Sequence, residues 1–526
     1  MHPLAKLDHL YLWHPFTQMR DWLKREPLVL VQACGAVLRD ARGREYLDAN
    51  SSIWTNLHGH NQPRLNAAIR QQLSKIAHSS ALGFANEPAS RLAEQLVKAA
   101  NPSSVAQAAS PRRARTLAGQ ASRLPRGRLA LEINAGRTPA PLPVPALRKV
   151  FLSDDGSTAI EVALKLAYEF TRRTGRSAKP KFLSLDGAYH GDSLGAVALG
   201  HIDRFHQAYA GLLFKTDKVM APYCYRCPFN RARPERADAR QYRKCRWQCL
   251  DTLARKFEVQ RKRGNPYAAF VFEPLVQGAA GMIPQPAGWL RRAAQIARAH
   301  DALLLADEVM TGFGRTGFLH PPTPSPAQAL SPAPAPPLFA CHHEAVQPDF
   351  LALAKGLTGG YLPMAATLTS QAVFDAFLGE YGEFKTFFHG HSFTGNQLGA
   401  AAALASLELL QGARSIRARQ QLEQALRDEL RALWSLPLVG DIRQVGLVAG
   451  VELVRDWRTR QPFDLRQRAG LRVCEAMAKR GVLTRPIGDV IVVMPPYCTT
   501  PEQVQCIVAA LRRAVSTLPG NASVRG

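Results

Sequence analysis

The sequence predicts an α/β fold, with a large and mostly parallel sheet between helices and a smaller α+β domain. Short, unbroken apolar runs such as "KFLSL", "ALLLADEV" and "DFLALA" alternate with longer stretches at helical spacing, such as "TAIEVALKLAYEFTRR". Apolar runs of this length are typical of strands buried on both faces, as in a parallel sheet. Near the C-terminus, "GLVAGVELV" and "VIVVMPP" predict strands beside amphipathic helices such as "LRVCEAMAKRG".

The chain has 526 residues, enough for more than one domain. We expect an N-terminal segment of the small domain at 1–57, a large domain at 58–412 and the rest of the small domain at 413–526. Two segments interrupt the large domain, at about 101–147 and 321–337. The first is rich in Ala, Arg and Pro, and the second has 8 prolines in 17 residues. Neither composition predicts a packed element.

The formal net charge of +26 could indicate a nucleic-acid partner. Its distribution favours solvated basic insertions instead, because 101–149 carries a net +8 and 224–249 a net +6. No apolar run reaches the roughly 20 residues of a membrane helix, and the N-terminus lacks a secretory pattern. We therefore expect a cytoplasmic protein without a membrane or nucleic-acid partner.

Four cysteines lie close together in the sequence, with the spacing C-x2-C-x17-C-x3-C: Cys224, Cys227, Cys245 and Cys249. Two such pairs suit a tetrahedral structural zinc ion. Reduced thiols without a metal, or an occasional disulfide, are the alternatives, and we assign no metal firmly. A metal-dependent nucleic-acid module built on these cysteines is a further alternative, but it rests on one loop.

Two charged residues follow buried strands. Lys355 ends the run "DFLALAK" and is followed by glycines. Burial lowers the pKa of a lysine, and such an amine can form a Schiff base with an aldehyde. Asp307 ends "ALLLAD", where a buried carboxylate needs a cationic partner such as the pyridine nitrogen of pyridoxal phosphate. Taken alone, each residue could equally be an ordinary group at a strand end.

Two further signals point to the same cofactor. In "FLSDDGSTAIEVALK", Gly156 and Ser157 lie where a strand passes into a helix, and a helix N-terminus can bind a phosphate. Tyr189, in "LDGAYHGD", is placed to stack on a flat ring. A plain N-cap and a plain turn aromatic are the alternatives. Together, the four signals lie at the carboxyl ends of strands, where open α/β sheets bind ligands.

The stretches "GAYHG", "LLLADEVMTGFGRTG", "DFLALAKGLTGG" and "FHGHSFTGNQL" resemble class III pyridoxal-phosphate-dependent aminotransferases of fold type I. The resemblance covers nearly the whole chain. It implies that Lys355 carries the cofactor, that Asp307 faces the pyridine nitrogen and that Tyr189 flanks the ring. It also implies a homodimer with shared active sites, in which "HGHSFTGN" reaches the neighbouring subunit. The implied cofactor-binding set is Gly156, Ser157, Tyr189, Asp307, Lys355, His391 and Ser392.

Within this family, "LWHPFTQM", "NSSIWTNLHGHNQP" and "VLTRPIGDVIVVMPPY" resemble the biotin-pathway branch, the 7,8-diaminononanoate synthases. This implies transfer of an amino group to 7-keto-8-aminopelargonate, a flexible apolar chain with a carboxylate. Arg485 offers a charged fork for that carboxylate, and Trp54 offers an apolar wall. Without the resemblance, the simpler interpretations would be a surface ion pair for Arg485 and a core position for Trp54. The full set of expected substrate-binding residues is Phe16, Ile53, Trp54, Tyr189, Lys355, Gly390 and Arg485.

The branch usually takes its amino group from S-adenosylmethionine, in a ping-pong reaction. Phe16 stands where many members have tyrosine, Ile53 stands where many have tryptophan, and His391-Ser392 replaces a common Pro-Thr. The first two departures leave lysine open as the donor. Another class III ω-aminotransferase that uses pyruvate is the remaining alternative.

Overall fold

The structure is a computed structural model that describes residues 1–102, 146–318 and 336–519. The expected insertions at about 101–147 and 321–337 lie almost entirely outside the described residues. At the first of them, Asn101 and Leu147 both lie within the described part. The Asn101 side chain accepts from the Leu147 N–H at 2.9 Å and donates to the Leu147 carbonyl at 2.8 Å, so the two ends of the segment are joined.

A mixed sheet of seven strands forms the centre of the fold, in the order β4-β12-β11-β10-β7-β5-β6. β12 runs antiparallel to both of its neighbours, and the other neighbouring strands in this sheet are parallel. The strand bounds are β4 Leu147–Ser153, β5 Lys181–Leu185, β6 Asp217–Val219, β7 Tyr267–Phe272, β10 Leu303–Asp307, β11 Phe350–Leu353 and β12 Ala365–Ser370. The expected mostly parallel sheet is therefore confirmed, and β6 and β12 are its strands that the sequence did not reveal.

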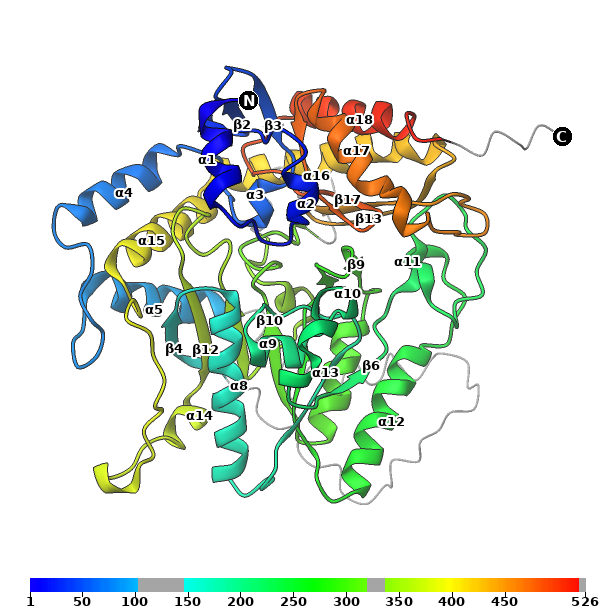
Figure 1. Cartoon of the computed structure of the whole chain (residues 1–526). Helices are drawn as coiled ribbons and strands as arrows, with labels where there is room; N and C mark the ends of the chain where they lie inside the picture. The colour runs from blue at the N-terminus through cyan, green and yellow to red at the C-terminus, as the bar shows by residue number, and fades with distance from the viewer. Residues whose placement is uncertain (103–145, 319–335, 520–526) are drawn as a thin grey trace, which may run out of the picture.

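Alternate residues of these strands enter two separate hydrophobic clusters, one on each face of the sheet. Leu303 and Leu305 of β10 pack with the apolar side of helix α8, whereas Leu304 and Ala306 pack with residues of α5, α12 and α13. Both faces are covered, which explains why the strands are continuous apolar runs. Figure 1 shows these helices around the sheet.

Two helices were expected from apolar periodicity, over "TAIEVALKLAYEFTRR" and "LRVCEAMAKRG", and both are present, as α8 and α17. The N-terminal helices are α1 Pro3–Tyr11, α2 Met19–Trp22, α4 Pro63–Leu73 and α5 Glu87–Ala100, and the label α3 marks a short turn with positive φ values, Ser51–Trp54. The helices of the central region are α8 Gly156–Arg173, α9 Leu194–Leu199, α10 Asp203–His206, α11 Ala239–Tyr242, α12 Gln248–Lys262, α13 Trp289–Ala299, α14 Gln371–Asp375 and α15 Gln397–Gln411. The C-terminal helices are α16 Ala413–Arg431, α17 Ala469–Ala478 and α18 Pro501–Val515. Among these helices, none is both long and apolar enough to cross a membrane.

Strands from both ends of the chain pair with each other. β15 (Val482–Leu483) runs parallel to β3 (Glu45–Asp48) in a sheet of order β1-β2-β3-β15, where β1 is Leu30–Cys34 and β2 is Val37–Asp40. A second sheet has the order β13-β14-β17-β16, with bounds Val439–Val445, Val448–Leu453, Val490–Val493 and Pro486–Ile487. This pairing supports the proposed division into 1–57, 58–412 and 413–526, which stays a prediction.

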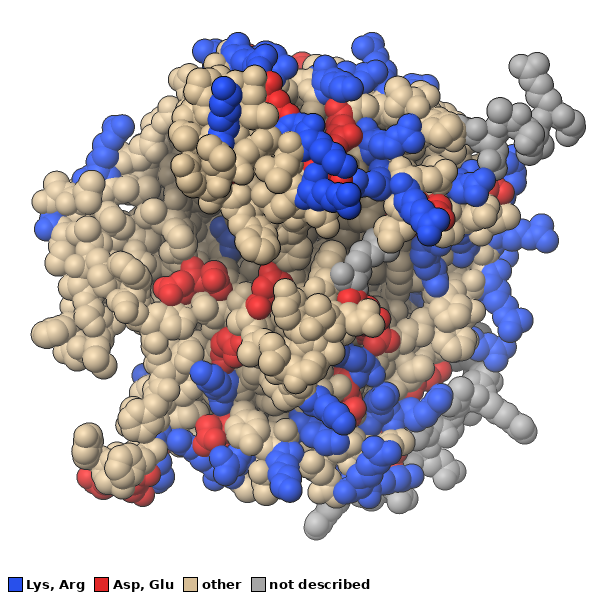
Figure 2. All heavy atoms as spheres, viewed as in Figure 1, with Lys and Arg blue, Asp and Glu red and all other residues tan. Residues whose placement is uncertain are grey.

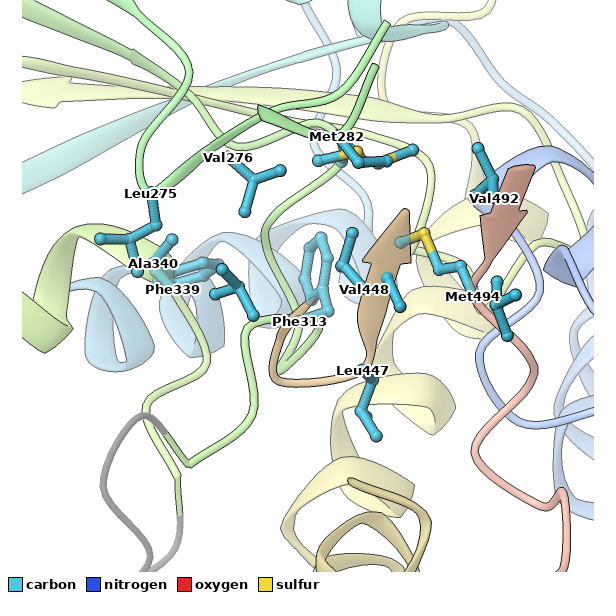
Figure 3. Packing of buried hydrophobic residues seen from close by; sticks show 14 of the residues in the cluster. Leu275, Val276, Met282, Phe313, Phe339, Ala340, Leu447, Val448, Val492 and Met494 are labelled. Carbon is cyan, nitrogen blue, oxygen red and sulfur yellow. The ribbon is translucent and has the colours of Figure 1, made fainter. Parts of the chain in front are cut away.

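The larger hydrophobic cluster continues from the central sheet into the C-terminal part of the chain. Figure 3 shows Phe313 and Phe339 beside Leu447, Val448 and Met494. A hairpin, β8 (Val276–Gln277) with β9 (Ile283–Pro284), supplies further apolar side chains to this contact. The two parts therefore share one core, and the cavity described below lies beside this shared core.

The segment with four cysteines lies against the C-terminal part, where its arginines bind carbonyls and a carboxylate. Arg226 donates to Glu452 at 2.6 Å, and Arg236 donates to the carbonyls of Trp434, Leu436 and Val439. All four thiols are free. Within the described residues, no group of three or more His, Cys, Asp and Glu side chains is arranged to hold a metal ion, so the zinc hypothesis gains no support.

Candidate active site

A cavity of about 500 Å³ opens where the carboxyl ends of the central strands meet. Asp154–Ser157 follow β4, Tyr189–Gly191 follow β5, Glu273 follows β7, Asp307 ends β10 and Lys355 follows β11. Parallel strands bring these loops to one edge of the sheet, which is the ligand edge of open α/β folds. In Figure 2 this face is hollowed near its centre, with acidic side chains along the hollow.

Lys355 projects into this cavity from the end of a fully buried strand. Burial lowers the pKa of its ammonium group, and the nearby carboxylates of Asp307 and Glu273 oppose that shift. The lysine Nζ lies 5.4 Å from the centre of the Trp54 ring. A lysine with a lowered pKa has a larger fraction of free amine at neutral pH, as a Schiff-base lysine requires.

Asp307 is buried and oriented by two donors. The Val309 N–H donates to its Oδ1 at 3.0 Å, and His190 Nδ1 lies 2.7 Å from its Oδ2. His190 is itself buried, and its Nε2 has no hydrogen-bond partner among the described residues.

Glu273 lies beside this pair, and burial raises the pKa of its carboxyl group to about 7. The N–H groups of Gly278 and Tyr189 donate to it at 2.7 and 3.2 Å. The Asp307 carboxylate raises the pKa of Glu273 further, whereas His190 lowers it. Beside Asp307, the cavity wall therefore contains the carboxyl group of Glu273, which changes charge near neutral pH.

The start of α8 forms a close-fitting cradle. A Cβ atom on Gly156 would lie 2.7 Å from the Val309 side chain, and one on Gly191 would lie 2.1 Å from Ser157 Oγ. Gly191 also has φ +122°, which favours glycine. Ser157 Oγ accepts the Asp192 N–H at 3.1 Å, which leaves its own hydroxyl hydrogen available to an anion. With the first amides of the helix, this geometry suits a phosphate.

Tyr189 lines the cavity with its ring supported on one side. Its hydroxyl donates to Asp192 Oδ2 at 2.6 Å, and the ring of His206 lies nearly parallel to it at an angle of 14°. Burial and the Asp192 carboxylate both raise the pKa of Tyr189, so its hydroxyl stays protonated. A flat, fixed ring of this kind can flank a planar cofactor.

The structure places the remaining expected residues outside the cavity lining of the single chain. Phe16 is exposed and contacts Phe205 edge-on, and Ile53 is also exposed. Gly390 and Ser392 are exposed, while His391 Nδ1 lies 2.9 Å from an oxygen of Asp154, which does line the cavity. Arg485 lies exposed between β15 and β16.

Sequence reasoning missed three residues of the cavity region: His190, Glu273 and Asp192. A signal existed for each. His190 and Asp192 are neighbours of Tyr189 in "GAYHGD", and Glu273 directly follows the buried run "FVF". A charged residue directly after a buried strand was the signal that identified Asp307 and Lys355, and it applies equally to Glu273.

Comparison with known proteins places the chain in a family. Residues 20–123, 138–324 and 336–515 match the family described as Aminotransferase class-III. The gaps in this match fall within the two expected insertions. Similar curated proteins carry the name adenosylmethionine-8-amino-7-oxononanoate aminotransferase. The protein from Geobacter sulfurreducens is 42% identical, with 98% of each chain covered, and that from Aquifex aeolicus is 38% identical, with 98% and 97% covered.

Solved structures agree with the fold. The adenosylmethionine-8-amino-7-oxononanoate aminotransferase of Methanocaldococcus jannaschii has a TM-score of 0.79 and 34% identity, with 98% of each chain covered. An omega transaminase of Pseudomonas jessenii, solved with PMP, has a TM-score of 0.79 and 25% identity at the same coverage. The expected fold type I is thus confirmed, and the cavity fits the family's cofactor, pyridoxal phosphate. The chain belongs to the class III aminotransferases.

Proposed function

We propose that the chain transfers the amino group of S-adenosylmethionine to 8-amino-7-oxononanoate (7-keto-8-aminopelargonate), giving 7,8-diaminopelargonate for biotin synthesis in the cytoplasm. The observation that carries this proposal is the similarity over nearly the full length to several proteins that bear that name, at up to 42% identity. The cavity supports it, because its lining combines a lysine, an aspartate and a phosphate-sized cradle with apolar walls.

The residues of the cavity would divide the work of holding the cofactor. Ser157 and the first amides of α8 would bind its phosphate, Asp307 would face its ring nitrogen and Tyr189 would flank its ring. Bound pyridoxal phosphate supplies an electron sink that stabilises negative charge on the carbon of the amino donor. His190 holds the Asp307 carboxylate in place, because its Nδ1 lies at hydrogen-bond distance from Oδ2.

Lys355 would act as the base and acid of the reaction. Its Nζ, with a lowered pKa, would take a proton from the α-carbon of the donor in the first half-reaction and would deliver a proton to the former ketone carbon of the acceptor in the second. Trp54 stands over this amine and restricts the access of water. Its indole face and Met310 offer an apolar wall to the chain of the acceptor.

We further propose a homodimer with shared active sites. Large apolar side chains are exposed on the segments that contain "FHGHSF" and "ALGFAN", including Phe388, Phe393, Leu82 and Phe84. Exposed apolar side chains in such number suit a surface covered by a second copy. In that arrangement His391 and Ser392 would serve the neighbouring cavity, as the resemblance implies. Light scattering would give the mass, and mixing Lys355→Ala with Ser392→Tyr subunits would recover activity only if the sites are shared.

The reaction itself is tested with the purified protein loaded with pyridoxal phosphate. The acceptor 8-amino-7-oxononanoate is offered with S-adenosylmethionine or with lysine as the amino donor. Formation of 7,8-diaminopelargonate is followed by mass spectrometry, and Lys355→Ala serves as the inactive control. Product formation with S-adenosylmethionine supports the proposal. If product forms with lysine and not with S-adenosylmethionine, lysine is the donor instead.

The other candidate is an ω-aminotransferase that uses pyruvate. The fold of this chain is as similar to the omega transaminase of Pseudomonas jessenii as to the Methanocaldococcus jannaschii protein, with a TM-score of 0.79 for both. Alanine formation from pyruvate and a diamine, with no 7,8-diaminopelargonate under any condition, would replace the proposal by this alternative. Complementation of a bacterial strain that lacks the corresponding biotin step provides an independent check.

A further inference from the structure

Four consecutive residues beside the cavity have a left-handed backbone. Ser51, Ser52, Ile53 and Trp54 have φ values of 47°, 48°, 66° and 69°, and none of them is glycine. Left-handed conformations normally occur as single residues, mostly glycine, because the Cβ atom approaches the following carbonyl oxygen. Such strain persists only where the surroundings fix the backbone, and it is concentrated at functional sites.

Side chains on the N-terminal side fix the first part of this turn. Asp48 accepts the Ser52 N–H at 3.2 Å and its hydroxyl at 3.1 Å, and His60 Nε2 lies 3.0 Å from the same carboxylate. The Ser51 hydroxyl donates to the Met494 carbonyl at 2.7 Å. The turn is thus attached both to the N-terminal sheet and to the segment that follows β17.

Arg315 fixes the far end of the turn. Its guanidinium donates to the carbonyls of Trp54 at 3.4 Å and Asn56 at 3.2 Å, and also to the carbonyl of Pro495 at 3.1 Å. The side chain is 1% exposed and packs over the ring of Tyr497. Among the described residues, no carboxylate forms a salt bridge with it. Burying a cation without a carboxylate partner costs free energy. The position of the Arg315 guanidinium beside three carbonyls therefore indicates that its role is to donate hydrogen bonds to them.

We propose that Arg315 is a positioning residue that holds the Trp54 indole over Lys355, by tying the end of the left-handed turn to the segment after β17. The indole then forms a fixed wall for the apolar chain of the acceptor, and the wall depends on a residue that lies outside the cavity lining. The role of the indole in binding the acceptor rests on the proposed function, whereas the positioning of Trp54 by Arg315 does not.

A matched control is present in the same core. Arg419 is also 1% exposed and also packs over the Tyr497 ring, but its guanidinium donates to the carbonyls of Leu410 and Ser415. Arg315→Met and Arg419→Met therefore remove the same charge from the same environment. Only the first removes contacts with the turn.

The first measurement uses the apoenzyme and reports the position of Trp54. The protein has seven tryptophans, so the Trp54 signal is obtained by subtracting the emission of each variant's Trp54→Phe counterpart. Acrylamide should quench this signal at least about twofold more strongly in Arg315→Met, because a released indole is more accessible to solvent. Arg419→Met should leave the quenching unchanged. Equal quenching in wild type and Arg315→Met, or an equal rise in both variants, overturns the proposal.

The second measurement uses the loaded enzyme. Arg315→Met should raise the KM for 8-amino-7-oxononanoate about tenfold and change kcat less than about threefold, because the wall binds the acceptor before and during reaction alike. A fall in kcat at unchanged KM contradicts this role. If Arg315→Met does not fold, Arg315→Lys is used, since a lysine cannot reach the three carbonyls together. The same quenching criteria then apply. Altered quenching in a protein that does not use this acceptor would refute the proposed function and leave the positioning role intact.

Discussion

Replacement of Gly191 by alanine should disturb both the phosphate cradle and the stability of the fold. The added Cβ would lie 2.1 Å from Ser157 Oγ and 2.6 Å from Ser157 Cβ, at a φ of +122°. Overpacking of this kind costs about 1–3 kcal/mol, and a backbone region reserved for glycine adds about 1–3 kcal/mol. We therefore expect a loss of stability of about 2–6 kcal/mol, unless Ser157 moves away.

Gly175→Ala is the matched control. Gly175 also has a positive φ, +69°, but a Cβ there would meet no atom within 4 Å. Its cost should be only about 1–2 kcal/mol, from the left-handed backbone. The difference between the two variants therefore reports the contact with Ser157 together with the less favourable backbone conformation of Gly191.

Cofactor affinity gives the decisive measurement. If Ser157 moves, its hydroxyl no longer reaches the phosphate, and a hydrogen bond to a charged group contributes about 1.5–3 kcal/mol. Titration of the apoenzyme with pyridoxal phosphate, followed by absorbance, should show a Kd raised roughly 10- to 150-fold for Gly191→Ala. Gly175→Ala should bind as the wild type does. Equal melting temperatures and equal affinities for the two variants would refute the assignment of the cradle.

Three further predictions concern buried groups. Arg443→Met should cost about 3–5 kcal/mol in urea unfolding, because it leaves the buried carboxylate of Asp441 without its partner and removes one of the two arginines that bind Glu452. The exposed pair of Arg25 with Glu475 should cost under about 1 kcal/mol when Arg25→Met removes it, and similar costs for the two variants would contradict this. The pKa of Glu273 is raised from 4.5 to about 7, so the stability that its protonated form contributes below pH 4.5 is lost as pH rises through 7. Between pH 4 and 8 the unfolding free energy of the Glu273→Gln apoenzyme should thus fall by about 3 kcal/mol less than that of the wild type. Parallel profiles of unfolding free energy against pH would show the prediction to be wrong. Burial raises the pKa of Cys224 to about 12, so iodoacetamide at pH 8 should modify the exposed Cys34 well before Cys224, as peptide mass spectrometry would reveal.

Much of the site could be predicted because the candidate catalytic and cofactor-binding residues lie at or soon after the ends of buried strands. Lys355, Asp307 and Tyr189 lie far apart in the sequence, yet the carboxyl ends of parallel strands bring them to one cavity. The strands themselves were recognisable as short apolar runs between helices. β12 was not recognised, because "AATLTS" has small and polar residues, and its burial comes from β4 and β11 along its edges and from packed elements such as α8 on its faces.

Other features have no local signal in the sequence. The stretch "SSIW" contains no glycine or asparagine that would predict a left-handed turn. Asp48 lies only four residues before Ser52, but the contacts with Met494 and Arg315 that also fix the turn come from distant segments. Arg226 and Arg236 were interpreted as part of a solvated basic loop. In the structure they donate to groups of the C-terminal part, and such pairing cannot be inferred from charge alone.

The hydrogen bonds between Asn101 and Leu147 have a consequence for how the length of this protein can change. They join the two ends of the 45 residues that lie between them, and so fix the end of α5 to the start of β4. The entropy cost of loop closure grows only with the logarithm of the loop length, by about 0.6 kcal/mol for each doubling. A change in the number of residues between Asn101 and Leu147 should therefore cost little in loop-closure entropy.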